Sequence, residues 1–325
     1  MLYNSLAILA GFALLIWSAD RFICGTAAVA KHFNISPLVI GIVIVGFGTS
    51  APEMLVAVMA SLDKSPGLAI GNALGSNITN IALVLGTAAL VKPLDVHSKL
   101  LRKEIPILLG AMFLALALVV LDNELGRVDG LILLLSLVGV MWWLTHEALH
   151  NRKPDIMLAE YKEELPAAMP MPRALFWLVV GLVVLLASSK LLVWGAVNVA
   201  TAFGVSDLVI GLTVVAIGTS LPELAATVAS ALKNEHDIAI GNIVGSNMFN
   251  ILAVFGIPGL LAPGKLEPGV LTRDFPVMIA LTIALALMSY GFHKEGRINR
   301  IEGGFLLLSF FAYQALLFYS VEGAH

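Results

Sequence analysis

The sequence GTSAPE at residues 48–53 returns as GTSLPE at residues 218–223, an offset of 170 residues. A second stretch, GNALGSNITN at 71–80, returns at the same offset as GNIVGSNMFN at 241–250. Over an 18-residue window around each motif, the two copies share 11 residues. The sequence around them is strongly apolar. Repetition of hydroxyls, amides and one carboxylate therefore indicates that a functional site has been duplicated together with the fold.

The composition is that of a membrane protein. Apolar residues make up 59% of the chain and charged residues 13%, and the mean hydropathy is +0.94, whereas a soluble domain has about 25% charged residues. Ten apolar runs are each close to the ~20 residues that cross a bilayer core. They lie at about 5–30, 36–61, 67–91, 105–121, 128–149, 174–200, 207–232, 238–261, 275–292 and 301–318. Because these runs lack the polar–apolar alternation of a barrel, we predict an all-α membrane protein with ten transmembrane helices.

The distribution of positive charge predicts the orientation. If the N-terminus is outside, 13 of the 19 Lys and Arg residues fall in loops on the inside and 4 in loops on the outside, while Arg21 and Lys190 lie within spans. Because positive charge accumulates in cytoplasmic loops, we expect both termini on the extracytoplasmic side of a cell inner membrane. Five spans per half is an odd number, so the halves cross the bilayer in opposite senses as two inverted-topology five-helix repeats.

The expected domain organisation follows from this repeat. We place the first repeat at residues 1–150, a cytoplasmic linker at 151–173 and the second repeat at 174–325, all within one integrated membrane domain. The linker mixes charges with four prolines. It is much shorter than a folded regulatory domain, which typically has about 100–150 residues.

The Thr-Ser-x-Pro-Glu unit concentrates oxygen ligands within about one helical turn. Thr49 and Ser50 precede Glu53 by four and three residues, so both hydroxyls share a helix face with the carboxylate. Pro52 lacks a backbone N–H and its ring clashes with the carbonyl of Gly48, so we expect a bend that frees backbone oxygens nearby. The second half repeats the unit at Thr219, Ser220 and Glu223.

The second motif places three polar side chains on one helix face. Asn72, Ser76 and Asn80 follow one another at intervals of four residues. The second half repeats them at Asn242, Ser246 and Asn250. Together the halves offer two carboxylates with hydroxyl, amide and carbonyl oxygens. That set suits a hard cation such as Ca²⁺, which takes about 6–8 oxygen ligands.

The two glutamates carry most of the functional prediction. Ser, Thr and Asn in membrane helices commonly form interhelical hydrogen bonds of about 0.6 kcal/mol, which is a sufficient explanation for any one of them alone. A carboxylate at mid-bilayer costs about 2.5–3.5 kcal/mol, and Glu53 and Glu223 occupy equivalent positions, so we predict a cation pathway there. Asp20 and Arg21 in the first run are expected to pair with other groups or to reach the interface. Lys190 aligns with Asp20 in the sixth run.

These motifs resemble the two α-repeats of the Ca²⁺:cation antiporter superfamily, in particular its prokaryotic sodium/calcium exchanger-like branch. The resemblance covers nearly the whole chain, with Gly-Thr-Ser-x-Pro-Glu on the second and seventh spans and Gly-Ser-Asn-x-x-Asn on the third and eighth. It implies that the first and sixth helices slide across the other eight and expose the site alternately to the two sides. The short linker lacks the large Ca²⁺-sensing insert of animal relatives.

The resemblance also implies roles for individual residues. Glu53 and Glu223 would be carboxylates shared between Ca²⁺ and Na⁺ sites. Hydroxyl, amide and backbone oxygens would come from Thr49, Ser50, Thr219, Ser220, Ser76, Asn80, Ser246, Asn250, Gly46 and Ala216. Ca²⁺ and Na⁺ would bind as transported substrates, with no resident cofactor. Exchangers similar to this chain often carry Asp where Asn250 stands, so the formal charge of this site is −2 instead of −3.

We therefore predict a secondary antiporter that exchanges Ca²⁺ for Na⁺ by alternating access, complete within one protomer in the lipid bilayer and without a nucleic-acid partner. A proton/calcium antiporter of the same fold is the alternative, because the same carboxylates could release protons. A cation channel is a remote alternative, since channel filters are usually symmetric rings. An enzyme is not expected, because no His or Lys is spaced to activate Ser50 or Ser220 within its own span.

Overall fold

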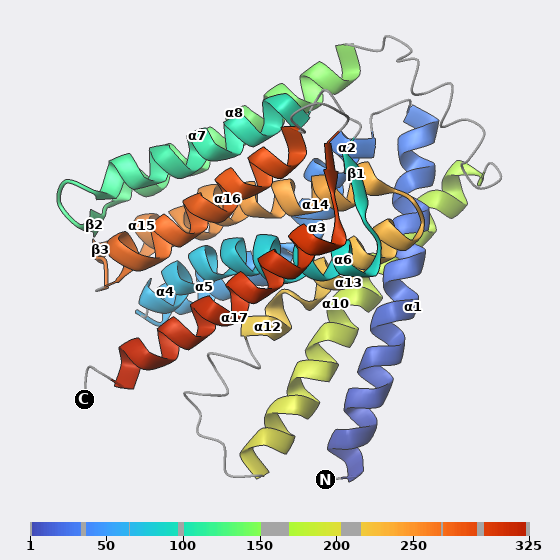
Figure 1. The fold of residues 1–325 in the computed structure, drawn as a ribbon, viewed down its shortest axis with the longest axis horizontal. Helices are drawn as coiled ribbons and strands as arrows, with labels where there is room; N and C mark the ends of the chain where they lie inside the picture. Colours follow the sequence, from blue (N-terminus) through green and yellow to red (C-terminus); the bar gives the residue numbers. More distant parts are fainter. Residues whose placement is uncertain are drawn as a thin grey trace.

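The structure is a computed structural model that describes residues 2–33, 37–64, 66–96, 101–150, 169–202, 216–267, 269–290 and 296–322. Nearly all of these residues are helical (Figure 1). The predicted linker at 151–173 lies outside the described residues up to position 168, and the first part of the seventh predicted span, 207–215, also lies outside them.

The helices of the first half follow the five predicted spans. They are α1 (Leu2–Phe33); α2 (Pro37–Ile40), the π-helical turn η1 (Gly41–Val45), α3 (Gly46–Thr49) and α4 (Ala51–Leu62); α5 (Pro66–Thr79), η2 (Asn80–Leu85) and α6 (Gly86–Val91); α7 (Leu101–Val119); and α8 (Arg127–His150). The second half repeats this order. Its helices are α10 (Met171–Ala202); α12 (Ala216–Thr219) and α13 (Leu221–Leu232); α14 (His236–Phe249), η4 (Asn250–Val254) and α15 (Gly256–Leu261); η5 (Val270–Asp274) and α16 (Phe275–Tyr290); and α17 (Arg300–Glu322).

Several of these spans are interrupted. The segments Gly41–Thr49 and Ala51–Leu62 meet at an angle of 48°, which confirms the bend predicted before Pro52. By length and hydropathy, six described helices are each long and apolar enough to cross a membrane, or seven if this bent pair counts as one span. The π-helical turns that begin at Asn80 and Asn250 were not predicted. Such turns occur mostly as single interruptions of α-helices and frequently lie at functional sites.

Two short strand pairs join loops that the charge analysis places on the same side of the membrane. β1 (Leu94–Val96) pairs antiparallel with β4 (Gly296–Ile298), and both lie in loops expected to be cytoplasmic. β2 (Glu124–Leu125) pairs with β3 (Gly264–Lys265), and both lie in loops expected to be extracytoplasmic. Each pair links one repeat to the other.

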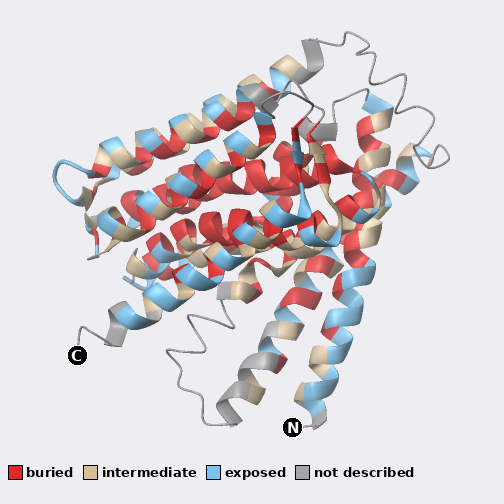
Figure 2. Cartoon of the chain, viewed as in Figure 1, coloured by how far each residue is buried: buried red, intermediate tan, exposed pale blue. Residues whose placement is uncertain are grey.

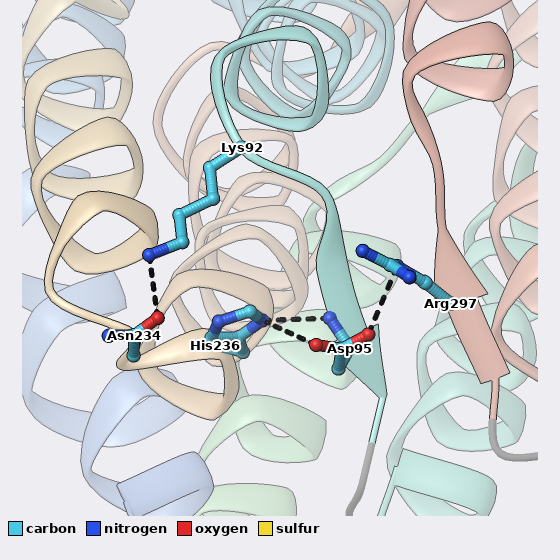
Figure 3. Close-up of polar contacts among 5 residues, drawn as sticks. All are labelled: Lys92, Asp95, Asn234, His236 and Arg297. Atoms are coloured by element: carbon cyan, nitrogen blue, oxygen red, sulfur yellow. Dashed lines mark hydrogen bonds and ion pairs between the residues drawn. The ribbon is translucent and has the colours of Figure 1, made fainter. Parts of the chain in front are cut away.

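Side chains strengthen the joint around β1. The Asp95 carboxylate lies 3.2 Å from Nε of Arg297 on β4, and the Asp95 N–H donates to Nδ1 of His236 at 2.7 Å (Figure 3). Lys92 donates to Oδ1 of Asn234 at 2.6 Å (Figure 3). The loops that flank α6, α14 and α17 are thereby held together at one end of the helix bundle.

The core is centred on α14, in which every residue is buried, and buried residues concentrate in the helices around it (Figure 2). α1 and α10 form a separate pair that runs side by side along one flank of this core (Figure 1). Large apolar side chains are exposed on outer helices such as α1, α8 and α17, as expected for surfaces that face lipid.

The turn between α13 and α14 contains a buried titratable group, Glu235, that predicts pH-dependent stability. Burial raises the pKa of Glu235 to about 7, with the charge of Asp237 adding to the effect and Lys233 opposing it. The folded state therefore binds this proton more tightly than the unfolded chain. The contribution of Glu235 to the stability of the fold is therefore largest below the ordinary pKa of 4.5 and is lost as the pH rises through about 7.

We expect Glu235→Gln to remove this loss of stability at high pH, because the amide cannot ionise. The variant should be more stable than the wild type at pH 8, by about 1–3 kcal/mol, and nearly equal to it at pH 4.5. Melting curves in detergent at the two pH values measure the difference. An equal shift at both values would show that Glu235 does not titrate in this way.

Candidate cation-binding site

The two broken helices bring one acid from each repeat to the centre of the molecule. Glu53 lies in the first turn of α4 and Glu223 in the first turn of α13, and the two are 1% and 0% exposed. A carboxylate is favoured at a helix N-terminus because the backbone N–H groups there carry partial positive charge. Ser50, at the break before α4, donates from Oγ to Oε1 of Glu223 at 3.4 Å. The first-repeat motif therefore contacts the second-repeat acid directly.

Thr49 connects the same break to α14. Its Oγ1 lies 3.1 Å from Oδ1 of Asn242 and 3.2 Å from Oγ of Ser246, and it donates to the Val45 carbonyl at 3.1 Å. Asn242 in turn donates from Nδ2 to Oγ1 of Thr227 at 2.9 Å and approaches the Glu223 carbonyl at 3.4 Å. These bonds fix the orientation of the Asn242 amide, so that its oxygen points at Thr49.

A second polar layer joins the start of η2 to α14. Asn80, where η2 begins, donates from Nδ2 to Oδ1 of Asn247 at 3.1 Å. Asn247 approaches the backbone carbonyl of Asn77 at 3.5 Å. Ser76, on the same helix face as Asn80, lies 3.5 Å from Oδ1 of Asn72. The polar face of α5 therefore meets its counterpart on α14 through side-chain amides.

Several buried polar atoms of the cluster have no hydrogen-bond partner among the described residues. They are both carboxylate oxygens of Glu53, Oε2 of Glu223, Oγ of Ser220, Oδ1 of Asn80 and both amide atoms of Asn250. Buried polar atoms in native proteins are nearly always paired, so such a concentration needs an explanation. Most of these atoms are oxygens, which suits a hard cation as a transported substrate.

The donor set also defines the type of site. Within the part of the chain that the structure describes, no group of three or more His, Cys, Asp or Glu side chains is arranged to hold a metal ion. A cation at this position would be held by two carboxylates supplemented by neutral oxygens. Such a site has less fixed charge than a site built for permanent metal retention, which favours release as well as binding.

The remaining predicted residues lie at the same two breaks. Gly46 is buried in α3, and its carbonyl accepts from the Ser50 N–H at 3.1 Å and lies 3.5 Å from Oγ1 of Thr49. Ala216 begins α12, as the mirror counterpart of Gly46. Thr219 ends α12 and is half-buried, and Ser220 is buried at the break that follows. The structure thus gathers the predicted residues around the two breaks and the polar faces of α5 and α14.

Some polar contacts of the cluster were not predicted. Asn77 and Asn247 are equivalent residues at the 170-residue offset, so comparison of the two halves could have identified them as site residues. Thr227 could not be identified in this way, because Ala57 stands at its mirror position. Ser189 of α10 donates to the Gly218 carbonyl at 3.0 Å. This carbonyl lacks its usual helical hydrogen bond, because Pro222, four residues later, has no backbone N–H to donate.

A family model described as sodium/calcium exchanger protein matches residues 4–146 and 173–319, which include almost all of both halves. The chain belongs to the sodium/calcium exchanger family. Members of the family are cation antiporters and not enzymes, and the motif resemblance noted in the sequence is therefore confirmed.

Relatives of this exchanger chain match it over nearly its full length. CaxA of Alkalimonas amylolytica is 49% identical over 98% of this chain and 100% of its own. The inner membrane protein YrbG of Escherichia coli is 39% identical over 98% of both chains.

A solved structure of the sodium-calcium exchanger NCX_Mj, soaked with Na⁺ and Sr²⁺, superposes with a TM-score of 0.83 at 32% identity. The superposition covers 97% of this chain and 98% of that one. This likeness confirms the predicted fold, an all-helical, multi-pass membrane protein of ten transmembrane helices in two inverted repeats.

Proposed function

We propose that this protein exchanges Ca²⁺ for Na⁺ across the cell inner membrane by alternating access, with both termini on the extracytoplasmic side. The observation that carries the proposal is the buried cluster in which Glu53 and Glu223, one from each repeat, lie among hydroxyl and amide oxygens. The inner-membrane location is supported by the relative YrbG, and the choice of ions by NCX_Mj.

Antiport requires that two ions compete for overlapping ligands. If Ca²⁺ and Na⁺ both use Glu53 and Glu223, only one of them occupies the site at a time, and each must leave before the other binds. The carboxylates are fully buried, so the empty site would carry two uncompensated charges through a low-dielectric region. That cost disfavours crossing by the empty carrier and couples the two fluxes.

The neutral oxygens around the two acids support Na⁺ as the coupling ion. Two carboxylates balance one Ca²⁺, and Asn250 adds only a neutral amide with no hydrogen-bond partner among the described residues. Na⁺ can use the same oxygens, whereas protons would use the carboxylates alone. The number of neutral oxygens gathered around the acids favours Na⁺ over protons as the second substrate.

Flux in proteoliposomes tests the coupling. We expect Ca²⁺ loaded inside to leave when Na⁺ is supplied outside, and to remain when only a pH gradient is imposed. Ca²⁺ movement driven by the pH gradient without Na⁺ would replace the proposal with proton/calcium antiport. Unitary conductance steps in planar bilayers would instead indicate a channel.

A further inference from the structure

Among the described residues, an ion pair joins the α1–α10 pair to the helix core at one face. Nζ of Lys233, at the end of α13, lies 2.6 Å from Oδ1 of Asp20 on α1. Lys233 also lies near the Cys24 thiol and the Glu235 carboxyl, and Asp20 has a weaker contact with Arg21 at 3.9 Å. α1 packs against α13 around this contact.

The internal repeat supplies a second, charge-reversed copy of this pair. At the 170-residue offset, Asp20 corresponds to Lys190 on α10, and Lys233 corresponds to Asp63 at the end of α4. The acidic residue lies on the long helix in the first pair and at the end of the shorter helix in the second pair, and the basic residue is placed the other way round. Lys190 and Asp63 are both exposed, and among the described residues neither has an ion-pair partner. Because the repeats are inverted, this second pair belongs to the opposite face of the membrane.

The glycines of the repeated motif show the same asymmetry. Gly245 is packed so closely that an added Cβ would lie 2.4 Å from the Ile42 carbonyl oxygen, and Gly46 is packed against Ser246. Gly75, the mirror position of Gly245, has no described atom within 4 Å of an added Cβ. The same holds for Gly71, which lies four residues earlier on α5 and is exposed. Among the described residues, the face of α14 beside Lys233 is therefore covered, and the face of α5 beside Asp63 is not.

α1 and α10 are built to move as one body. An added Cβ at Gly25 of α1 would lie 2.4 Å from the Leu178 backbone nitrogen, and one at Gly181 of α10 would lie 2.6 Å from that of Phe22. Such backbone contacts hold two helices together along their length. A shift of this pair along the core would separate Asp20 from Lys233 and carry Lys190 with it.

We propose that the pairs Asp20–Lys233 and Lys190–Asp63 are alternating latches, one closed in each access state, so that the first must break before the second can form. The proposal rests on the alternating access described above. Each latch stabilises the state in which its own face is sealed. Among the residues that the structure describes, the Asp20–Lys233 latch is closed and the Lys190–Asp63 latch is not formed.

Labelling of a reporter cysteine tests the latches independently of transport. The reporter replaces Gly71 in a Cys24→Ser background, and a membrane-impermeant maleimide is applied in proteoliposomes from the Asp63 face. Asp20→Asn should slow labelling and Asp63→Asn should accelerate it, each by up to about fivefold, as expected for a partly exposed ion pair. The charge swap Asp20→Lys with Lys233→Asp should return the rate toward that of the background. Glu124→Gln, on the same face, is the control and should not change the rate.

Shifts of both neutralised variants in the same direction, or an unchanged rate for Asp20→Asn, would overturn the latches. So would a charge swap that fails to restore the rate. If Asp20→Asn does not fold, Asp63→Asn and the swap still give the decisive comparison. Ca²⁺ flux is measured on the same vesicles. If the two variants change the labelling rate in opposite directions but no Ca²⁺ flux is seen, the latches are supported and the proposed substrate is contradicted. If Ca²⁺ flux is seen but the labelling rate does not change, the substrate is supported and the latches are contradicted.

Discussion

Replacement of Glu53 or Glu223 by Gln is expected to abolish Ca²⁺ exchange and leave the fold intact. Each substitution keeps the shape of the side chain and removes half of the formal negative charge of the site. Removing one partner from a buried ionic contact costs about 3–5 kcal/mol, so transport should fall by about 100-fold or more. The fold should survive, because a neutral amide is cheaper to bury than an unpaired carboxylate.

The measurement is Na⁺-driven Ca²⁺ efflux from proteoliposomes that contain equal amounts of each variant. Elution as a single symmetric peak and an unchanged or higher melting temperature would establish that the variants are folded. Glu124→Gln, a carboxylate outside the cluster, serves as the matched control and should transport at the wild-type rate. Near wild-type efflux in either cluster variant would refute the assignment of that glutamate.

Gly245→Ala is expected to destabilise the protein, whereas the equivalent change Gly75→Ala should not. The added methyl group at position 245 would meet the Ile42 carbonyl oxygen at 2.4 Å and its Cα at 2.7 Å. Backbone atoms cannot move aside as a flexible side chain can, so we expect a loss of about 1–3 kcal/mol, the usual cost of overpacking. The methyl group at position 75 meets no described atom within 4 Å.

The two alanine variants form a matched pair, because the glycines occupy equivalent positions of the repeat. Melting temperatures in detergent, measured side by side, give the comparison. Equal losses in both variants would mean that Gly75 is packed as closely as Gly245, in contradiction to the surroundings of the two glycines among the described residues. Transport by Gly75→Ala is expected to slow even though its fold is unaffected, since the opposite access state should close on that position.

The topology could be predicted from the sequence because lipid constrains it strongly. Long apolar runs must be helical, and the repeated motifs reveal the inverted halves. The orientation that the loop charges indicate stays a prediction. The bend before Pro52 was predictable for a similar reason, since a proline ring affects its own helix whatever the surroundings.

The contacts between repeats could not be predicted in the same way. Helical spacing shows which residues share a face within one half, but the pairing of Thr49 with Asn242 and Ser246 depends on how the two halves dock. The π-helical turns at Asn80 and Asn250 have no local sequence signal such as a proline. Thr227 and Ser189 lie where the repeats differ, so comparison of the halves does not reveal them.

The position of a bound divalent cation tests the central claim most directly. Crystals of the protein soaked with Sr²⁺ would locate the ion by its anomalous scattering. We predict one Sr²⁺ ion ligated by oxygens of both Glu53 and Glu223, with the remaining ligands from the hydroxyls and amides around them. A Sr²⁺ ion held by only one of the two glutamates, or bound elsewhere in the molecule, would contradict the shared site.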